Sequence, residues 1–147
     1  MIITFCGHSS YSGNMQDEEK ILTLLEKISN SEDLTFYLGG YGGFDGFAKH
    51  CCKKYKELHP NSKIVFITPY LGKWLDDRKE YIEKEYDEVI YPELESVPPK
   101  YAISRRNEWM VNHSARVIAV YNGESGGTKN TIDYSVRQNV EIVQIKG

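Results

Sequence analysis

Two glycine-rich segments have the composition of loops that bind phosphate. The first, LGGYGGFDG, covers residues 38–46, and the second, NGESGGT, covers residues 122–128. Each follows an apolar run typical of a strand and precedes an amphipathic run typical of a helix. Backbone N–H groups and the positive end of a helix dipole can meet a phosphate at such a junction. Neither segment matches the dinucleotide fingerprint or the P-loop pattern, but two of them together favour a phosphate or nucleotide site over simple turns.

Each glycine-rich segment also contains an acid, Asp45 in the first and Glu124 in the second. Asp45 stands where a carboxylate can cap a helix and favour its dipole. Either acid could instead hold a ribose hydroxyl pair or do acid–base work on a glycosidic bond. Capping is at least as well supported for Asp45, whereas Glu124 remains open.

A third polar segment, CGHSSYSG, covers residues 6–13 and follows the first apolar run. Ser9, Ser10 and nearby backbone N–H groups could donate to a phosphate or a sugar. Cys6 and His8 could form a nucleophile–base pair, but side chains two apart on a strand point to opposite faces, so a buried thiol is favoured. The histidines and cysteines lack metal-ligand spacing, and we expect neither a metal nor a cofactor.

An arginine and an asparagine fall on an otherwise apolar helical stripe formed by Ile103, Arg106, Asn107 and Met110. A charged group on that side needs a partner. One alternative is a salt bridge between Arg106 and an internal acid. The other, which we favour narrowly, is a ligand phosphate in the crevice.

Short apolar runs alternate with longer amphipathic segments, as in α/β proteins. The strand-like runs cover residues 2–6, 34–38, 63–68, 88–91, 116–121 and 140–145. Most are continuous, as in parallel strands buried on both faces, and the last is typical of an edge strand. Helical stripes occur at residues 21–28, 44–55, 71–82, 102–112 and 129–138. The pattern predicts a three-layer α/β domain, Rossmann-like, with a mostly parallel sheet of five or six strands.

Length and composition limit the classes of protein. The 147 residues, 40% apolar and 27% charged, predict one globular domain covering residues 1–147. No apolar run approaches the ~20 residues of a membrane span, and the N-terminus does not resemble a signal peptide. Three cysteines fit a reducing cytoplasm. A net charge of −3 argues against a general nucleic-acid or membrane binder.

In order, CGHSS, GGYGGFDGFA, RRNEWMV and NGESGGTKNTIDYS resemble motifs of the SLOG superfamily. That superfamily includes the Lonely guy phosphoribohydrolases, the Rossmann-like domain of the DNA-processing protein A family, and nucleotide-sensing domains of bacterial defence systems. The resemblance spans most of the chain. It implies a Rossmann-like fold, a site for nucleotides or nucleotide-derived sugars, and a homo-oligomer.

The resemblance also implies particular site residues. Arg106 and Met110 match the Arg…Met pair before the second loop, and Gly126, Gly127 and Thr128 loosely match the phosphate turn. The phosphoribohydrolases continue that turn with a catalytic Glu, and Thr131 occupies its position here. We therefore expect binding of an AMP-like or ADP-ribose-like ligand without turnover. The expected ligand-binding residues are Gly7, Ser9, Ser10, Gly39, Gly40, Gly42, Gly43, Phe44, Asp45, Arg106, Asn107, Gly123, Ser125, Gly126, Gly127 and Thr128.

Two alternative functions stay open at this stage. The first is an N-glycoside hydrolase that releases the base from nucleoside 5′-monophosphates, with Glu124 or Asp45 as the catalytic carboxylate. The second is a DNA-handling partner protein, which the likeness at Arg106-Asn107 suggests and which the missing basic stripe argues against.

Overall fold

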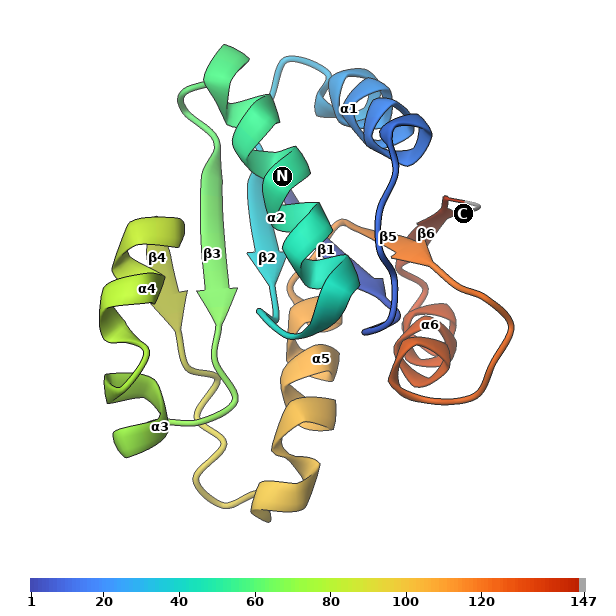
Figure 1. Ribbon diagram of the computed structural model, residues 1–147. Helices are drawn as coiled ribbons and strands as arrows, with labels where there is room; N and C mark the ends of the chain where they lie inside the picture. Colours follow the sequence, from blue (N-terminus) through green and yellow to red (C-terminus); the bar gives the residue numbers. More distant parts are fainter. Residues whose placement is uncertain (146–147) are drawn as a thin grey trace.

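The computed structural model describes residues 1–145 and contains one six-stranded sheet in which every pair of neighbouring strands is parallel (Figure 1). The strand order is β4-β3-β2-β1-β5-β6. The predicted parallel α/β sheet is confirmed, and the last strand lies at an edge as expected. The strands are β1 (Ile2–Gly7), β2 (Thr35–Leu38), β3 (Lys63–Ile67), β4 (Glu88–Ile90), β5 (Arg116–Val120) and β6 (Glu141–Gln144).

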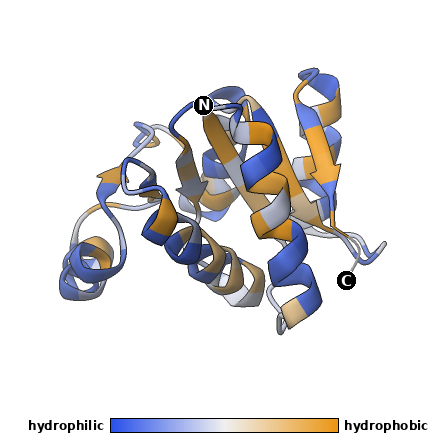
Figure 2. Cartoon of the chain, turned by 90° about the horizontal axis from the view of Figure 1, so that it is seen from above, coloured by the Kyte–Doolittle hydropathy of each residue, from blue (hydrophilic) through white to orange (hydrophobic). Residues whose placement is uncertain are grey.

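Helices cover both faces of the sheet, which completes the three layers (Figure 1). One face carries α1 (Met15–Ser29) and α2 (Gly42–Leu58), whose apolar sides join the larger core cluster with Phe36 of β2. The other face carries α5 (Ala102–Asn112) and α6 (Gly127–Arg137). The short 3-10 helix Pro99–Tyr101 leads into α5. Hydrophobic residues are concentrated on the strands of the sheet, whereas the helices alternate between hydrophobic and hydrophilic residues (Figure 2).

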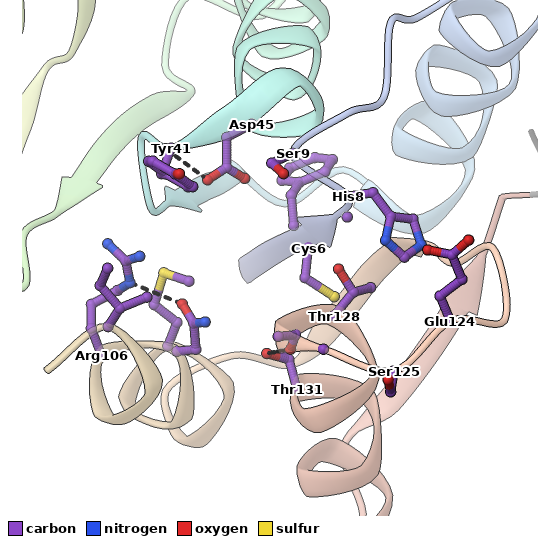
Figure 3. Close-up of a pocket in the computed structure, with 17 residues that line it drawn as sticks. Cys6, His8, Ser9, Tyr41, Asp45, Arg106, Glu124, Ser125, Thr128 and Thr131 are labelled. Carbon is purple, nitrogen blue, oxygen red and sulfur yellow. Dashed lines mark hydrogen bonds between the residues drawn. The ribbon is translucent and has the colours of Figure 1, made fainter. Parts of the chain in front are cut away.

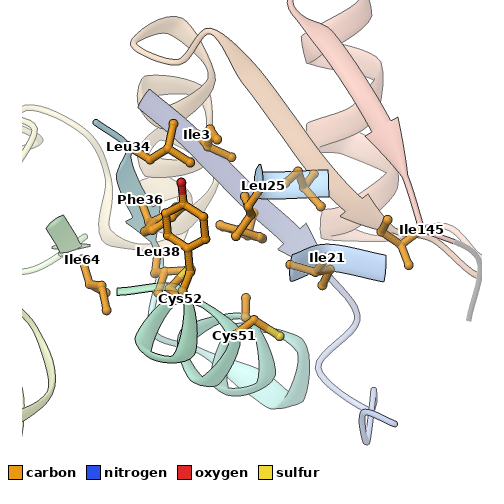
Figure 4. Close-up of a cluster of buried hydrophobic side chains, with 14 of the residues drawn as sticks. Ile3, Ile21, Leu25, Leu34, Phe36, Leu38, Cys51, Cys52, Ile64 and Ile145 are labelled. Atoms are coloured by element: carbon orange, nitrogen blue, oxygen red, sulfur yellow. The ribbon is translucent and has the colours of Figure 1, made fainter. Parts of the chain in front are cut away.

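The amphipathic stripes explain why these segments form helices in these places. Ile21 and Leu25 of α1 are fully buried, at the spacing that places both on one side of a helix. Asn14 caps the start of α1, because its side chain accepts a hydrogen bond of 2.7 Å from the backbone N–H of Asp17. In the same cluster, Cys51 and Cys52 of α2 pack with Leu25 and Phe36 (Figure 4). The core thus holds α1 and α2 against the central strands.

The segment 71–82 differs from the single helix expected from its apolar spacing. It forms two short helices, α3 (Lys73–Asp76) and α4 (Lys79–Glu85), separated by Asp77 and Arg78. No side chain of α3 is buried and only Ile82 of α4 is, so this segment lacks the continuous buried stripe that stabilises a longer helix.

The topology creates a crevice between β1 and β5. After β1 the sheet grows in one direction, through β2, β3 and β4. The chain then returns along the opposite face of the sheet and adds β5 to the other side of β1. The strand order reverses between β1 and β5, and the loops that leave the carboxyl ends of these two strands diverge. Open α/β sheets bind ligands at such a topological switch point. The ends are level with each other, since Gly7 pairs with Val120. Within residues 1–145, no helix combines the length and apolarity that crossing a membrane would require.

Candidate ligand site at the β1–β5 switch point

A cavity of about 340 Å³ lies at the carboxyl ends of β1 and β5 (Figure 3). The loop after β1, the start of α2, one side of α5, and the loop and first turn of α6 form its walls. The two glycine-rich segments therefore face one crevice. The lining residues are Phe5, Cys6, Gly7, His8, Ser9, Tyr41, Asp45, Ile103, Arg106, Asn107, Met110, Glu124, Ser125, Gly126, Gly127, Thr128 and Thr131.

Not every residue predicted for the site lies on the cavity wall. Those found there are Gly7, Ser9, Asp45, Arg106, Asn107, Glu124, Ser125, Gly126, Gly127 and Thr128. The others lie outside it: Ser10, Gly39, Gly40, Gly42, Gly43, Phe44 and Gly123. The sequence analysis did not place Phe5 or the apolar wall from α5 in the site, and it named Thr131 only as the position of an expected catalytic Glu. The helical stripe that Ile103 and Met110 share with Arg106 was the available signal for that wall.

The start of α2 is closed by the protein's own backbone. The N–H of Gly43 donates to the carbonyl of Ser9 at 2.8 Å, and the N–H of Phe44 donates to the carbonyl of His8 at 3.2 Å. A Cβ atom on Gly43 would lie 2.0 Å from the carbonyl oxygen of Tyr11, so only glycine permits this approach. The prediction of a phosphate site at this helix end is therefore wrong for these two amides. Here the glycine serves close packing of two loops.

The start of α6 is open. Gly126 precedes the helix with φ of 140° and provides no side-chain cap. The first amides of a helix have no intrahelical acceptor, and those of Gly127, Thr128 and Lys129 have no other partner among residues 1–145. Thr128 is only 9% exposed, its hydroxyl has no hydrogen-bond partner within the described chain, and its side chain lines the cavity (Figure 3). This helix end has the donors that bind an anion.

Arg106 is buried, and backbone carbonyls hold its guanidinium. Its Nη1 donates to the carbonyl oxygens of Gly39 and Ile67, each at 2.9 Å, and its Nε donates to the Oδ1 of Asn107 at 2.9 Å. The expected salt bridge is absent, because no carboxylate within residues 1–145 pairs with Arg106, whereas the ligand alternative stays a prediction. Nη2 has no hydrogen-bond partner in the same range, and the side chain lines the cavity. Burial lowers the pKa of Arg106, and the nearby Asp45 opposes that effect.

Asp45 accepts a hydrogen bond at the start of α2 and also lines the cavity. One of its carboxylate oxygens accepts a hydrogen bond of 3.1 Å from the N–H of Tyr41, the residue that precedes α2. The same side chain lines the cavity. Burial raises the pKa of Asp45 to about 6, and the Tyr41 hydrogen bond and the charge of Arg106 partly offset that increase. Asp45 is therefore a capping residue that can exchange a proton near neutral pH.

Glu124, the second acid, and Thr131, which occupies the position of the expected catalytic Glu, have surroundings unlike those of Asp45. Glu124 is exposed on the cavity wall, and its N–H donates to the side chain of Asn122 at 2.9 Å. Thr131 is buried, and its hydroxyl donates to the carbonyl of Gly127 at 2.9 Å. The position that the resemblance assigns to a catalytic carboxylate thus stabilises the first turn of α6.

Cys6 and His8 do not form a nucleophile–base pair. Burial, with a contribution from Asp45, raises the pKa of the Cys6 thiol to about 12, which disfavours the reactive thiolate. The Nε2 of His8 accepts a hydrogen bond of 2.7 Å from the N–H of Asn122, and its ring stacks on Tyr121. His8 therefore connects the loop after β1 with the loop after β5. Among residues 1–145, no three histidine, cysteine or acidic side chains cluster as metal ligands would.

Comparison with known proteins identifies the fold but leaves the ligand open. No family model matches the chain. The chain is 29% identical over 135 residues to the uncharacterized SPbeta prophage-derived protein YoqJ of Bacillus subtilis, covering 80% of this chain and 79% of that protein. The structure superposes on DNA processing protein A from Streptococcus pneumoniae with a TM-score of 0.66 over 99% of this chain, at 16% identity. The chain shares the Rossmann-like α/β fold of this structure.

Two further solved structures share this Rossmann-like fold. DNA processing protein A from Helicobacter pylori, described for its single-stranded DNA binding mode, matches with a TM-score of 0.66 over 98% of this chain, at 14% identity. The protein TM1055 matches with a TM-score of 0.56 over 96% of this chain and 71% of its own, at 14% identity. The chain spans 50% and 64% of the Streptococcus and Helicobacter structures. The fold expected from the sequence resemblance is confirmed.

Proposed function

We propose that the protein binds a nucleotide or nucleotide-derived sugar phosphate in the β1–β5 cavity, with a phosphate at the start of α6. The supporting observation is Thr128, a residue only 9% exposed whose side chain lines the cavity and whose hydroxyl has no partner among the described residues. A hydroxyl with free capacity on a cavity wall can donate a hydrogen bond to a phosphate oxygen. Beside it, the free amides of Gly127 and Thr128 give the donor arrangement that a phosphate accepts.

Charge supports the same location for the phosphate. The positive end of the α6 dipole and the buried guanidinium of Arg106 both favour an anion in the cavity. Asp45 and Glu124 on the same walls suit the hydroxyl groups of a ribose, which donate hydrogen bonds to carboxylates. Tyr41, 70% exposed at this wall, offers a ring on which a base can stack.

Isothermal titration calorimetry with AMP tests this proposal, using Thr128→Val as the variant. Valine has nearly the same shape as threonine but cannot donate, so the loss of one hydrogen bond to a charged group should weaken binding by about 1.5–3 kcal/mol. Thr23→Val, on the exposed side of α1, is the matched control and should bind like the wild type. Wild-type protein that binds neither AMP nor ADP-ribose would contradict the proposal.

A second candidate is hydrolysis of the N-glycosidic bond of a nucleoside monophosphate, and the observation in its favour is Asp45. A carboxyl group whose pKa is raised to about 6 can donate a proton to a leaving base near neutral pH. Multiple-turnover release of free adenine from AMP, abolished by Asp45→Asn and retained in Glu124→Gln, would establish this activity with Asp45 as the acid. Absence of free base leaves binding as the function.

Binding of single-stranded DNA is the third candidate, because one structural neighbour was described for that property. The net charge of −3 opposes it. A gel shift at low salt that shows no complex with single-stranded DNA would remove this candidate.

The proposal includes assembly into a homo-oligomer and a location in the cytoplasm. A homo-oligomer follows from the SLOG resemblance alone. Trp109 does not support an interface between copies of the chain, because its ring packs between Tyr37 and His113 with ring separations of 5.6 and 4.0 Å. Light scattering distinguishes an oligomer from the 16.9 kDa monomer. The free thiols of Cys6, Cys51 and Cys52 suit a reducing compartment such as the cytoplasm.

A further inference from the structure

A second hollow of about 250 Å³ adjoins the β1–β5 cavity and lies between α5 and α6. We call it the α5–α6 chamber. Four residues belong to the walls of both spaces: Ile103, Asn107, Gly127 and Thr131. The shared wall therefore includes the first residue of α6, whose amide is one of the free donors described above. A phosphate held at this helix end would have an open space on each side.

The two spaces differ in chemistry. The β1–β5 cavity contains Arg106, Asp45 and the exposed ring of Tyr41. The α5–α6 chamber is lined by the neutral polar side chains of Ser104, Asn107 and Asn130, and Lys100 and Glu108 add one charge of each sign to its wall. Ser104 and Asn130 are exposed and their side chains have no hydrogen-bond partner among residues 1–145, and Asn107 uses only its oxygen, toward Arg106. Hydroxyl and amide groups with free capacity match the hydroxyls of a sugar.

We propose that the ligand carries an organic group on both sides of its phosphate, as a nucleoside diphosphate sugar does, and that its second sugar lies in the α5–α6 chamber. A monophosphate has a substituent on one side of the phosphorus only, so it leaves this chamber empty. In a bound nucleoside diphosphate sugar, the first phosphate accepts hydrogen bonds from the α6 amides. The second phosphate then extends past Gly127, so that the distal sugar lies beside Ser104 and Asn130. This inference rests on the proposed function and narrows its ligand class.

The test compares AMP with ADP-ribose by calorimetry on the wild type and on Ser104→Trp. The tryptophan starts from an exposed position of α5 and fills the chamber, so α5 should keep its packing. The inference predicts that the wild type binds ADP-ribose at least about tenfold more tightly than AMP, as expected from one or two added hydrogen bonds. Ser104→Trp should remove that preference and leave the affinity for AMP within about twofold.

A milder variant and a matched control accompany this comparison. Asn130→Ala should reduce the affinity for ADP-ribose by about three- to tenfold and leave AMP unchanged. Asn61→Ala replaces an exposed asparagine that precedes β3, at the amino ends of the strands and away from both cavities, and should change the affinity for neither ligand.

The outcomes separate this inference from the proposed function. If AMP binds and ADP-ribose binds no more tightly, or if Ser104→Trp and Asn130→Ala weaken both ligands equally, the second subsite is wrong and the phosphate site stands. If neither ligand binds the wild type, the proposed function fails and this inference fails with it.

Discussion

The Nη1 atom of Arg106 lies 2.9 Å from the carbonyl oxygen of Gly39, a residue 67 positions earlier in the chain. The same nitrogen donates to the carbonyl of Ile67. One guanidinium thus joins the carboxyl ends of β2 and β3 to α5 on the far face of the sheet. Arg106 is therefore a structural group of the cavity wall as well as a source of positive charge.

Removal of Arg106 should destabilise the folded protein even without ligand. Arg106→Ala leaves two buried carbonyl oxygens without their donor, and each unsatisfied buried group costs about 1–3 kcal/mol. Urea denaturation should show a decrease of at least about 2 kcal/mol in the free energy of unfolding. Arg105→Ala, exposed on the same helix, should change it by less than about 0.5 kcal/mol. An unchanged midpoint for Arg106→Ala would contradict the structural role.

Gly39 should tolerate a side chain only when Arg106 is absent. A Cβ atom on Gly39 would lie 2.8 Å from the Cζ of Arg106, so Gly39→Ala must displace the guanidinium. We expect a loss of about 1–3 kcal/mol in the wild-type background. In the Arg106→Ala background the added cost should be much smaller, and the two changes should be non-additive. Additive losses in this double-mutant cycle would show that the contact is not responsible.

Asp45 should make stability decrease as the pH rises through about 6. Its pKa in the folded protein lies above the ordinary value of 3.8, so between these values the folded state holds a proton that the unfolded state has lost. The contribution is fully present below the ordinary pKa and is lost above the folded pKa. Asp45→Asn mimics the protonated form and should be more stable than wild type above about pH 7.

Urea denaturation of both proteins across this pH range isolates the contribution of Asp45 from that of the other carboxylates. The advantage of Asp45→Asn should shrink toward zero as the pH falls to about 4. A difference between the two proteins that does not vary with pH would contradict the raised pKa.

The three thiols should be unreactive in the folded protein. Burial raises the pKa of Cys6 and of Cys51 to about 12, and it raises that of Cys52 well above its usual range. Because the thiolate is the reacting species, a disulfide reagent at about pH 8 should modify none of them before unfolding. In guanidinium chloride all 3 cysteines should react. Rapid modification of Cys6 in the native protein would reopen its role as a nucleophile.

Most of the fold could be predicted from the sequence because buried parallel strands form continuous apolar runs. The expected run 63–68 became β3, Lys63–Ile67, and the stripe at 102–112 became α5. The prediction of one helix over residues 71–82 was wrong. Its apolar residues, Leu71, Trp74, Leu75 and Ile82, have helical spacing, but Leu71 is half exposed and α3 has no buried side chain. Periodicity alone does not report whether a stripe has a surface to pack against.

The site could be predicted only in part, because backbone partners leave no mark on the sequence. Glycine spacing located both loops, but nothing in it distinguishes Gly43, whose amide the carbonyl of Ser9 already occupies, from Gly127, whose amide is free. The partners of Arg106 are likewise carbonyls, which every residue carries. Composition identified the segments, and only the structure shows which of their amides remain available.

Amide chemical shifts during a titration with AMP report directly whether a phosphate binds at the start of α6. A phosphate at the start of α6 should shift the N–H resonances of Gly127, Thr128 and Lys129 strongly, because these donors have no other partner within residues 1–145. The N–H resonances of Gly43 and Phe44 at the start of α2 should move little, since the carbonyls of Ser9 and His8 already accept from them. The account is contradicted if saturating AMP leaves the α6 amides unchanged, or if the largest shifts occur at the start of α2.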